Sequence, residues 1–142
     1  MAPVVLDSSF YISSLRQGSS EISLRVVTGE GHVWLSAVVL SELFAGARDR
    51  RAISHLEKME RDFQLARRLL VPNAGDWSHA GRVLASLTKR YDYESHGRAR
   101  LLNDVLIAVS VGRTGATLIT ANARNFLRIT EFVPLNWRVQ LH

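Results

Sequence analysis

Short apolar runs alternate with longer amphipathic segments along this chain. Three runs predict buried strands, because they are short, rich in β-branched residues and bounded by polar turns: residues 3–6, 32–35 and 116–120. Residues 70–72 predict a short strand or an extended link, and residues 132–135 and 138–141 are candidate terminal strands. Strands that alternate with helices favour an α/β domain with a mainly parallel sheet.

The segments between these runs have the features of helices. Ser8 and Ser9, together with Asp7, supply capping residues for a helix that starts near Phe10, and Ser36 is a natural cap for the next long helix. Further helices are expected over residues 20–27 and 101–111, from Asp76 as the capping residue to about Tyr91, and from Asn122 onward, with a loop over residues 93–98.

Residues 49–70 carry the most regular amphipathic pattern and predict one long helix. Its expected apolar stripe consists of Ile53, Leu56, Met59, Phe63, Leu65 or Ala66, and Leu69. The helices over residues 37–91 form an unusually large insert for so small a sheet, and we expect this insert to protrude.

Three acids stand alone in apolar surroundings. Asp7 ends the first apolar run, Glu42 is the only charged residue in the segment SAVVLSELFAGA, and Asp104 is the only ionisable residue within residues 101–111. A carboxylate in such a setting is costly unless it is paired, hydrogen-bonded or bound to a cation. The repetition is the main indication of function.

These acids are expected to meet at one end of the sheet. In open parallel sheets, ligand sites lie beyond the carboxyl ends of the strands, where Asp7 and Thr120 are placed. Glu42 lies about two turns into the helix after a strand, and Asp104 is expected near the start of the helix before one. Converging carboxylates repel, which raises their pKa values. Because the chain has no cysteine, and no histidine near these acids, a hard divalent cation such as Mg²⁺ or Mn²⁺ is the natural compensation.

The composition indicates an ordinary globular protein. A length of 142 residues suits a single domain over residues 1–142, with 46% apolar and 22% charged residues. Without cysteine, neither disulfides nor thiolate metal sites are available. No apolar run approaches the roughly 20 residues that span a bilayer, and the first residues lack the features of a signal peptide. We therefore expect a cytoplasmic protein without membrane association.

The charge balance makes a nucleic-acid partner plausible. The net charge is +5, and all the cations except Lys58 and Lys89 are arginines, which suit bidentate phosphate contacts. Genome composition can produce the same bias. Arg48, Arg98 and Arg100 flank the acid-bearing segments and are candidates for phosphate contact, although the run over residues 48–51 is also typical of a solvated helix start.

The acid-bearing segments resemble a known family. VVLD, SAVVLSELFAGA, NDVLIAVS and LITANARNF, with the terminal VPLNW, resemble the signature of PIN-domain ribonucleases, and within them VapC-type toxins of bacterial toxin–antitoxin pairs. The resemblance covers nearly the whole chain in the right order. It implies a PIN-like three-layer α/β/α sandwich with a central, mainly parallel sheet. It also implies a Mg²⁺- or Mn²⁺-dependent endoribonuclease that forms a homodimer, cuts RNA and is inhibited by a cognate antitoxin.

The resemblance assigns roles to individual residues. Asp7, Glu42 and Asp104 match the acidic metal-binding positions of the family. Thr120 and Asn122 match its polar strand-end motif, which orients an acid or a water. The implied reaction is metal-assisted hydrolysis of a phosphodiester by a water whose pKa the cation lowers.

One departure from the family keeps a second function open. Asn125 stands where the family often has a further Asp or Glu, so a complete second metal site is in doubt, although an amide oxygen can still ligate weakly or hold a water. A PIN-fold module that binds RNA or a protein partner without efficient cleavage is the alternative. Taken singly, the acids also have structural readings: a strand-end cap for Asp7, a half-exposed helix residue for Glu42 and a helix-start acid for Asp104. The Thr–x–Asn sequence is also an ordinary capping turn.

A third class, the aspartyl-phosphate phosphatases, also places an Asp after a first apolar strand. That chemistry usually requires a second Asp two residues later, where this chain has Ser9, and a lysine near the phosphoryl group. Lys58 and Lys89 are the only lysines, and neither is an evident candidate. We therefore regard this class as the least favoured.

Overall fold

A five-stranded sheet, parallel throughout, forms the centre of the computed structural model, which describes residues 3–17, 32–93 and 95–140. The strand order is β3-β2-β1-β4-β5, so the first strand lies in the middle. The strands are β1 (Val4–Leu6), β2 (Val33–Ser36), β3 (Leu69–Leu70), β4 (Thr117–Thr120) and β5 (Asn136–Val139). The predicted α/β class is confirmed, and the expected mainly parallel sheet is entirely parallel in the described residues.

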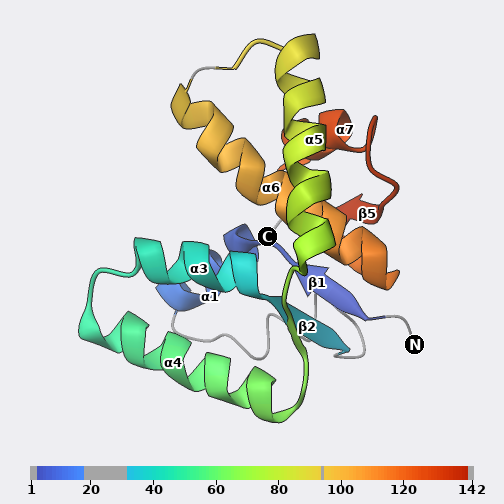
Figure 1. Cartoon of the computed structure of the whole chain (residues 1–142). Coiled ribbons are helices and arrows are strands. Elements are labelled where there is room, and N and C mark those ends of the chain that lie inside the picture. The colour runs from blue at the N-terminus through green and yellow to red at the C-terminus, as the bar shows by residue number, and fades with distance from the viewer. Residues whose placement is uncertain (1–2, 18–31, 94, 141–142) are drawn as a thin grey trace.

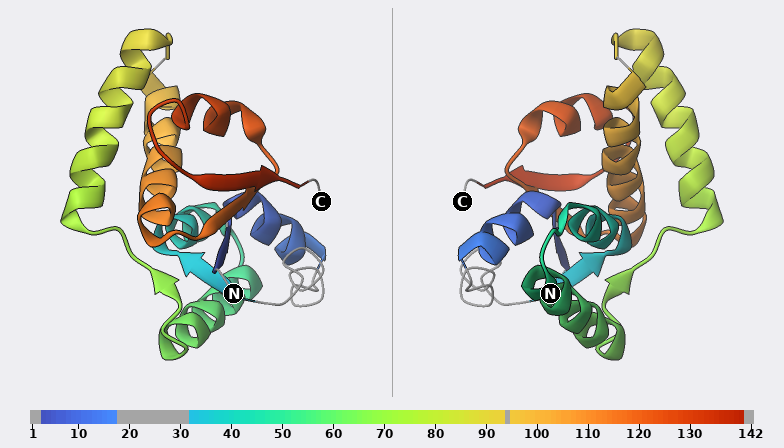
Figure 2. Two further views of the ribbon diagram at one scale, coloured as in Figure 1. Left: turned by 90° about the vertical axis from the view of Figure 1, so that its right-hand side faces the viewer. Right: turned by 90° about the vertical axis from the view of Figure 1, so that its left-hand side faces the viewer.

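Helices cover both sides of this sheet, as the two side views in Figure 2 show. The described helices are α1 (Ser8–Gln17), α3 (Ala37–Gly46), α4 (Arg50–Leu65), α5 (Ala74–Arg90), α6 (Ser95–Thr114) and α7 (Ala123–Ile129). In Figure 2, α6 and α1 lie on opposite sides of the sheet. The three-layer arrangement expected from the sequence is therefore confirmed. The helix expected over residues 20–27 falls outside the described residues.

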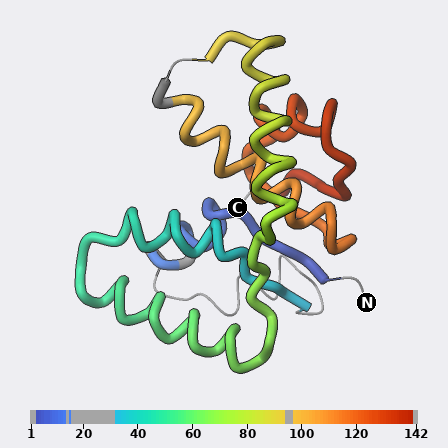
Figure 3. Tube along the Cα trace, viewed as in Figure 1, coloured from blue at the N-terminus to red at the C-terminus, as the bar shows by residue number. Residues whose placement is uncertain are grey.

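The helical insert packs on the domain, although α4 does so through few side chains and most residues of α4 are exposed. Helices α3 and α4 form a hairpin, and α5 runs back along α6 (Figures 1 and 3). Leu56 is fully buried, so α4 contributes to the core. Leu65, assigned to the apolar stripe as an alternative to Ala66, is 83% exposed, because the helix ends there and Arg67 adopts a left-handed backbone with φ 57°.

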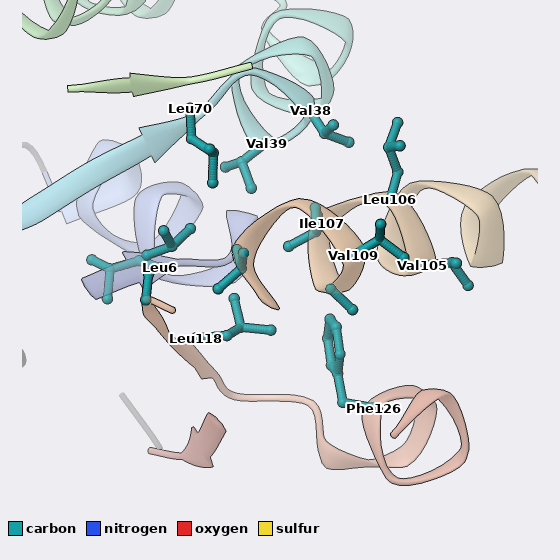
Figure 4. Close-up of a cluster of buried hydrophobic side chains, with 14 of the residues drawn as sticks. Leu6, Val38, Val39, Leu70, Val105, Leu106, Ile107, Val109, Leu118 and Phe126 are labelled. Carbon is teal, nitrogen blue, oxygen red and sulfur yellow. The ribbon is translucent and has the colours of Figure 1, made fainter. Parts of the chain in front are cut away.

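Helix α6 is the centre of the hydrophobic core. Figure 4 shows Val105, Ile107 and Val109 of this helix among side chains from the sheet and from neighbouring helices, including Leu118 and Phe126. Because α6 is surrounded on several sides, most of its residues between 105 and 111 are buried. The helix begins at Ser95, so the loop expected over residues 93–98 is wrong over most of its length. Asp104 consequently lies near the middle of the helix, and not near its start.

The N-terminus of α5 differs from the sequence expectation. Asn73, and not Asp76, is the N-cap, and the two residues form a reciprocal capping box. The Asn73 side chain accepts from the Asp76 backbone N–H at 2.8 Å, and the Asp76 carboxylate accepts from the Asn73 N–H at 3.0 Å. Asp76 also pairs with Arg113 at 2.9 Å, which ties the beginning of α5 to the end of α6.

Within residues 132–140 the C-terminal segment forms one strand, and not the two that were expected. β5 spans Asn136–Val139, whereas residues 132–135 have no strand structure. Val133 is nevertheless buried, and its N–H donates to the carbonyl of Ile129. The carbonyl oxygen of Pro134 lies 2.5 Å from the place where a Cβ on Gly112 would be, so this segment packs directly on the backbone of α6. None of the described helices combines the length and the apolar character that crossing a membrane requires.

Candidate metal centre

Asp7 is held rigidly at the carboxyl end of the central strand. The parallel register places Leu6 beside Ile119, so Asp7 comes next to Thr120 at the end of β4. The Thr120 hydroxyl donates to one carboxylate oxygen of Asp7, while the backbone N–H of Ser9 at 3.1 Å and the Ser9 hydroxyl donate to the other. Asp7 is only 8% exposed. Its orientation is therefore fixed before any ligand binds.

Glu42 approaches from the helix that follows β2. Ser36 is the N-cap of α3, as predicted, and its hydroxyl accepts from the N–H groups of Val38 and Val39 at 3.2 and 3.4 Å. Burial first, and then the charges of Asp104 and Asp7, raise the pKa of the half-buried Glu42 from 4.5 to about 7. A carboxyl with this pKa exchanges its proton near neutral pH.

Asp104 completes the group of acids from α6. Burial raises its pKa from 3.8 to about 6, and the charge of Asp7 acts in the same direction. The Asn125 side-chain amide opposes this shift by donating to the Asp104 carboxylate at 2.9 Å. The three acids from β1, α3 and α6 thus lie within one another's electrostatic field, as the sequence analysis expected.

The chemistry of these side chains fits a hard divalent cation. The three acids offer oxygen ligands, and burial followed by repulsion between the acids raises the pKa of Glu42 and Asp104, a cost that a cation would offset. The three carboxylates do not form a complete metal-binding site in this conformation. Among the described residues, no three His, Cys, Asp or Glu side chains lie close enough together to ligate one ion as they stand. Sharing an ion would therefore require these carboxylates to move closer together.

The polar residues after β4 have different positions. Thr120 is fully buried and supports Asp7, as described above. Asn122 is exposed and caps α7 by accepting from the Arg124 N–H at 3.2 Å, which is the structural alternative weighed for this turn. Asn125, considered as a weak oxygen ligand, presents its amide nitrogen to Asp104 and so acts as a hydrogen-bond donor.

The three candidate arginines differ in their electrostatic effect on the acids. Arg100, one helical turn before Asp104, lowers the pKa of both Glu42 and Asp104. Arg48 and Arg98 are exposed, and neither is among the groups that shift the pKa of Glu42 or Asp104. Their role in phosphate contact stays a prediction.

Asn103 is the residue that the sequence analysis missed. Its side chain forms a hydrogen bond with Glu42 that lowers the pKa of the carboxyl, so it links α6 to α3 at the centre of the acid group. The available signal was its position directly before Asp104, since adjacent polar residues on an otherwise apolar helix can both face the same site.

The sheet and the acids define the class of this protein. It is an α/β domain with a parallel sheet, and acids from three elements form a candidate metal site at the carboxyl end of the central strand. The sequence profile of the PIN domain matches residues 4–131. The chain belongs to the PIN domain family, which confirms the resemblance drawn from the sequence.

Individual relatives agree with this assignment. The chain is similar to Ribonuclease VapC2 of Haemophilus influenzae, with 25% identity over 96% of this chain and 99% of the relative. Among solved structures, it resembles DNA-bound VapBC from Salmonella typhimurium, with a TM-score of 0.68, 22% identity and coverage of 98% of each chain. It also resembles VapBC-1 from nontypeable Haemophilus influenzae, with a TM-score of 0.61, 25% identity and coverage of 96% of each chain.

Proposed function

We propose that this protein is a Mg²⁺- or Mn²⁺-dependent endoribonuclease that acts as the toxin of a type II toxin–antitoxin pair. The observation that carries the proposal is the electrostatic coupling of Asp7, Glu42 and Asp104, which come from three separate elements. Structural ion-pair networks also shift pKa values, but here the coupled groups are all acids at the end of a parallel sheet, where binding sites form. The ribonuclease names of the relatives support RNA as the substrate.

Each residue of the site has a distinct task in this proposal. Asp7, Glu42 and Asp104 would hold the cation, which would supply a lowered pKa for a bound water and polarise the phosphate. Thr120 fixes the Asp7 carboxylate, and Asn125 fixes that of Asp104. These contacts keep the oxygen atoms oriented, which is the usual role of groups that hydrogen-bond to metal ligands.

Proton transfer is assigned to Glu42. A general base works best when its pKa lies near the working pH, and the carboxyl of Glu42 has a pKa of about 7 in the metal-free protein, a value that a bound cation would lower. A carboxylate oxygen of Glu42 that is not bound to the cation would accept the proton of the attacking water. Arg100, whose charge is felt at both Glu42 and Asp104, is the best-placed of the candidate arginines to contact the negatively charged phosphate.

The partners follow from the same relatives. Several similar solved structures are VapBC or FitAB assemblies, which supports a cognate antitoxin as a protein partner. We further propose a homodimer located in the cytoplasm. Co-purification with the product of a neighbouring antitoxin gene, and release of nuclease activity when that partner is removed, would test the toxin assignment.

Cleavage of a structured RNA in Mn²⁺ tests the enzymatic proposal. The unaltered protein should cut internally and stop when EDTA is added. Asp104→Asn should abolish cleavage because it removes a ligand charge, whereas the exposed control Glu57→Gln should leave it unchanged. Cleavage that persists in Asp104→Asn would refute the assigned site. Binding of RNA without any cleavage would favour the non-cutting PIN module, and hydrolysis of a small phosphomonoester would favour the phosphatase.

A further inference from the structure

Two tyrosines and an arginine form a layered group near the N-terminal end of α6, the helix that carries Asp104, and this group is here named the tyrosine–arginine cluster. It consists of Tyr91 and Tyr93, from the connection between α5 and α6, and Arg128 of α7. The guanidinium carbon of Arg128 lies 4.3 Å from the centroid of the Tyr91 ring and 5.7 Å from that of Tyr93. Arg128 also donates to the Tyr93 hydroxyl at 3.1 Å. All three residues are half-buried.

The surroundings of the cluster are positively charged. Its flanking exposed cations are Lys89, Arg90 and Arg124, the last being one turn before Arg128 on α7. Two exposed acids oppose them, Asp92 and Glu131. Glu131 accepts from the Tyr91 hydroxyl and lies 3.9 Å from Arg90. With Arg128, four cations face two acids among the described residues, and Glu94, which follows Tyr93 in the sequence, lies outside them. This excess of positive charge favours a polyanionic partner over a positively charged or uncharged one.

The cluster is connected to the acids through two helices. Arg128 lies one turn after Asn125, which donates to Asp104. Tyr93 comes just before α6, where Asp104 stands nine residues beyond the first helical residue, or about 14 Å along the axis. Helices α6 and α7 pack together, and Figure 1 shows α7 near the α5–α6 pair. A few nucleotides of single-stranded RNA span such a distance.

We propose that the tyrosine–arginine cluster is a nucleobase-binding subsite, on which a base of single-stranded RNA stacks a short distance from the phosphate to be cut. The inference rests on the proposed function for the identity of the substrate. Aromatic rings and arginine planes are the groups on which proteins stack unpaired bases, and each base has a flat face that can add one more layer. The adjacent Arg124 would contact the RNA backbone and hold the strand against the cluster.

A binding assay under conditions that prevent cleavage distinguishes the stacking of bases from the electrostatic attraction of the RNA backbone. The full-length protein in EDTA is titrated into two fluorescein-labelled octamers of equal charge, an oligoadenylate and the same ribose–phosphate backbone without bases, and fluorescence anisotropy is recorded. The unaltered protein should bind the oligoadenylate more tightly, by roughly fivefold to a hundredfold, the range that stacking of a base on an aromatic group supplies. Equal affinity for the two octamers would overturn the proposal.

Variants locate the preference at the cluster. Arg128→Lys keeps the charge but removes the planar guanidinium group, and Tyr91→Leu removes an aromatic ring. Each change should therefore reduce the ratio of the affinities for the oligoadenylate and the base-free octamer to about one. Arg124→Gln is the matched control. It should weaken binding of both octamers by the same factor, because it removes a phosphate contact. Arg128→Lys and Tyr91→Leu proteins that have native circular dichroism and retain the full preference would contradict the assignment.

A measurement on the unaltered sequence covers the case in which these variants fold poorly. The chain has only three tyrosines, so fluorotyrosine labelling gives three ¹⁹F NMR signals. Oligoadenylate should shift the signals of Tyr91 and Tyr93 and leave that of the buried Tyr11 in place. Unshifted signals during RNA binding overturn the subsite alone. If the protein binds neither octamer, the proposed subsite is wrong, and the result also counts against the proposed ribonuclease function. The separate cleavage assay in Mn²⁺ then decides whether the protein is a ribonuclease. Saturable binding of an acidic peptide with the same shifts, in place of RNA, would identify the cluster as a protein-docking surface.

Discussion

The crowded acids predict that the metal-free protein loses stability as the pH rises toward neutrality. The pKa of Glu42 is raised from 4.5 to about 7 and that of Asp104 from 3.8 to about 6. A raised pKa means that the folded state holds the proton more tightly than the unfolded state does. The resulting stabilisation is complete below about pH 4 and is lost as the pH rises through about 6 to 7.

The magnitude follows from the same two groups. One pKa unit corresponds to about 1.4 kcal/mol, so the two shifts would amount to about 6 kcal/mol without solvent screening. Both carboxyls are partly open to solvent, which reduces this value, and we expect a loss of about 2 kcal/mol between pH 4.5 and 7.5. Asp76 does not interfere: burial opposes the shift, but hydrogen bonds from Arg113 and Asn73 hold its pKa below the ordinary value, so it stays ionised throughout this range.

Urea denaturation in EDTA at several pH values measures this effect. Glu42→Gln should flatten the fall in the free energy of unfolding, and the exposed control Glu57→Gln should not. Adding Mn²⁺ at pH 7.5 should restore stability, because a ligand that binds only the folded state stabilises it by mass action. Stability that increases from pH 5 to 7 in EDTA, or an unchanged slope in Glu42→Gln, would refute the electrostatic reasoning.

Two further predictions concern packing and orientation. Gly112→Ala should destabilise the protein by roughly 1–3 kcal/mol in urea denaturation, because its Cβ would lie 2.5 Å from the Pro134 carbonyl oxygen. Gly81→Ala, in a helix with open space around the added atom, should stabilise it by about 0.5–1 kcal/mol, and equal effects of the two changes would contradict the close approach. Thr120→Val should weaken Mn²⁺ binding by about tenfold or more in calorimetry, because Asp7 loses a donor that orients it; an unchanged affinity would argue against that role.

The meeting of Asp7 with Thr120 could be predicted from the sequence alone. Both follow short apolar strands, and neighbouring parallel strands end at the same edge of a sheet. The approach of Glu42 and Asp104 does not follow from strand positions alone, because the direction in which a helical side chain points depends on how the helix packs. Their placement in the sequence analysis relied on the family resemblance as well as on the pattern.

Features set by tertiary contacts could not be predicted. The apolar residues 132–135 have the composition of a strand, yet Val133 is buried in irregular structure that packs on α6 at Gly112. Periodicity does not distinguish these two ways of burying a short apolar run. Likewise, Asn103 and Asn125 are ordinary helix residues in the sequence, and only the packing of helices brings their amides to Glu42 and Asp104.

The central position of β1 gives the acid group one immobile member. Asp7 continues a strand that is hydrogen-bonded to neighbours on both sides, and its carboxylate is held by donors from α1 and β4. Glu42 and Asp104 instead project from helices and are held by hydrogen bonds with Asn103 and Asn125, which are also helical. Closure around a shared ion would thus be asymmetric. Asp7 would keep its place at the end of the sheet, and the carboxylates of Glu42 and Asp104 would move toward it.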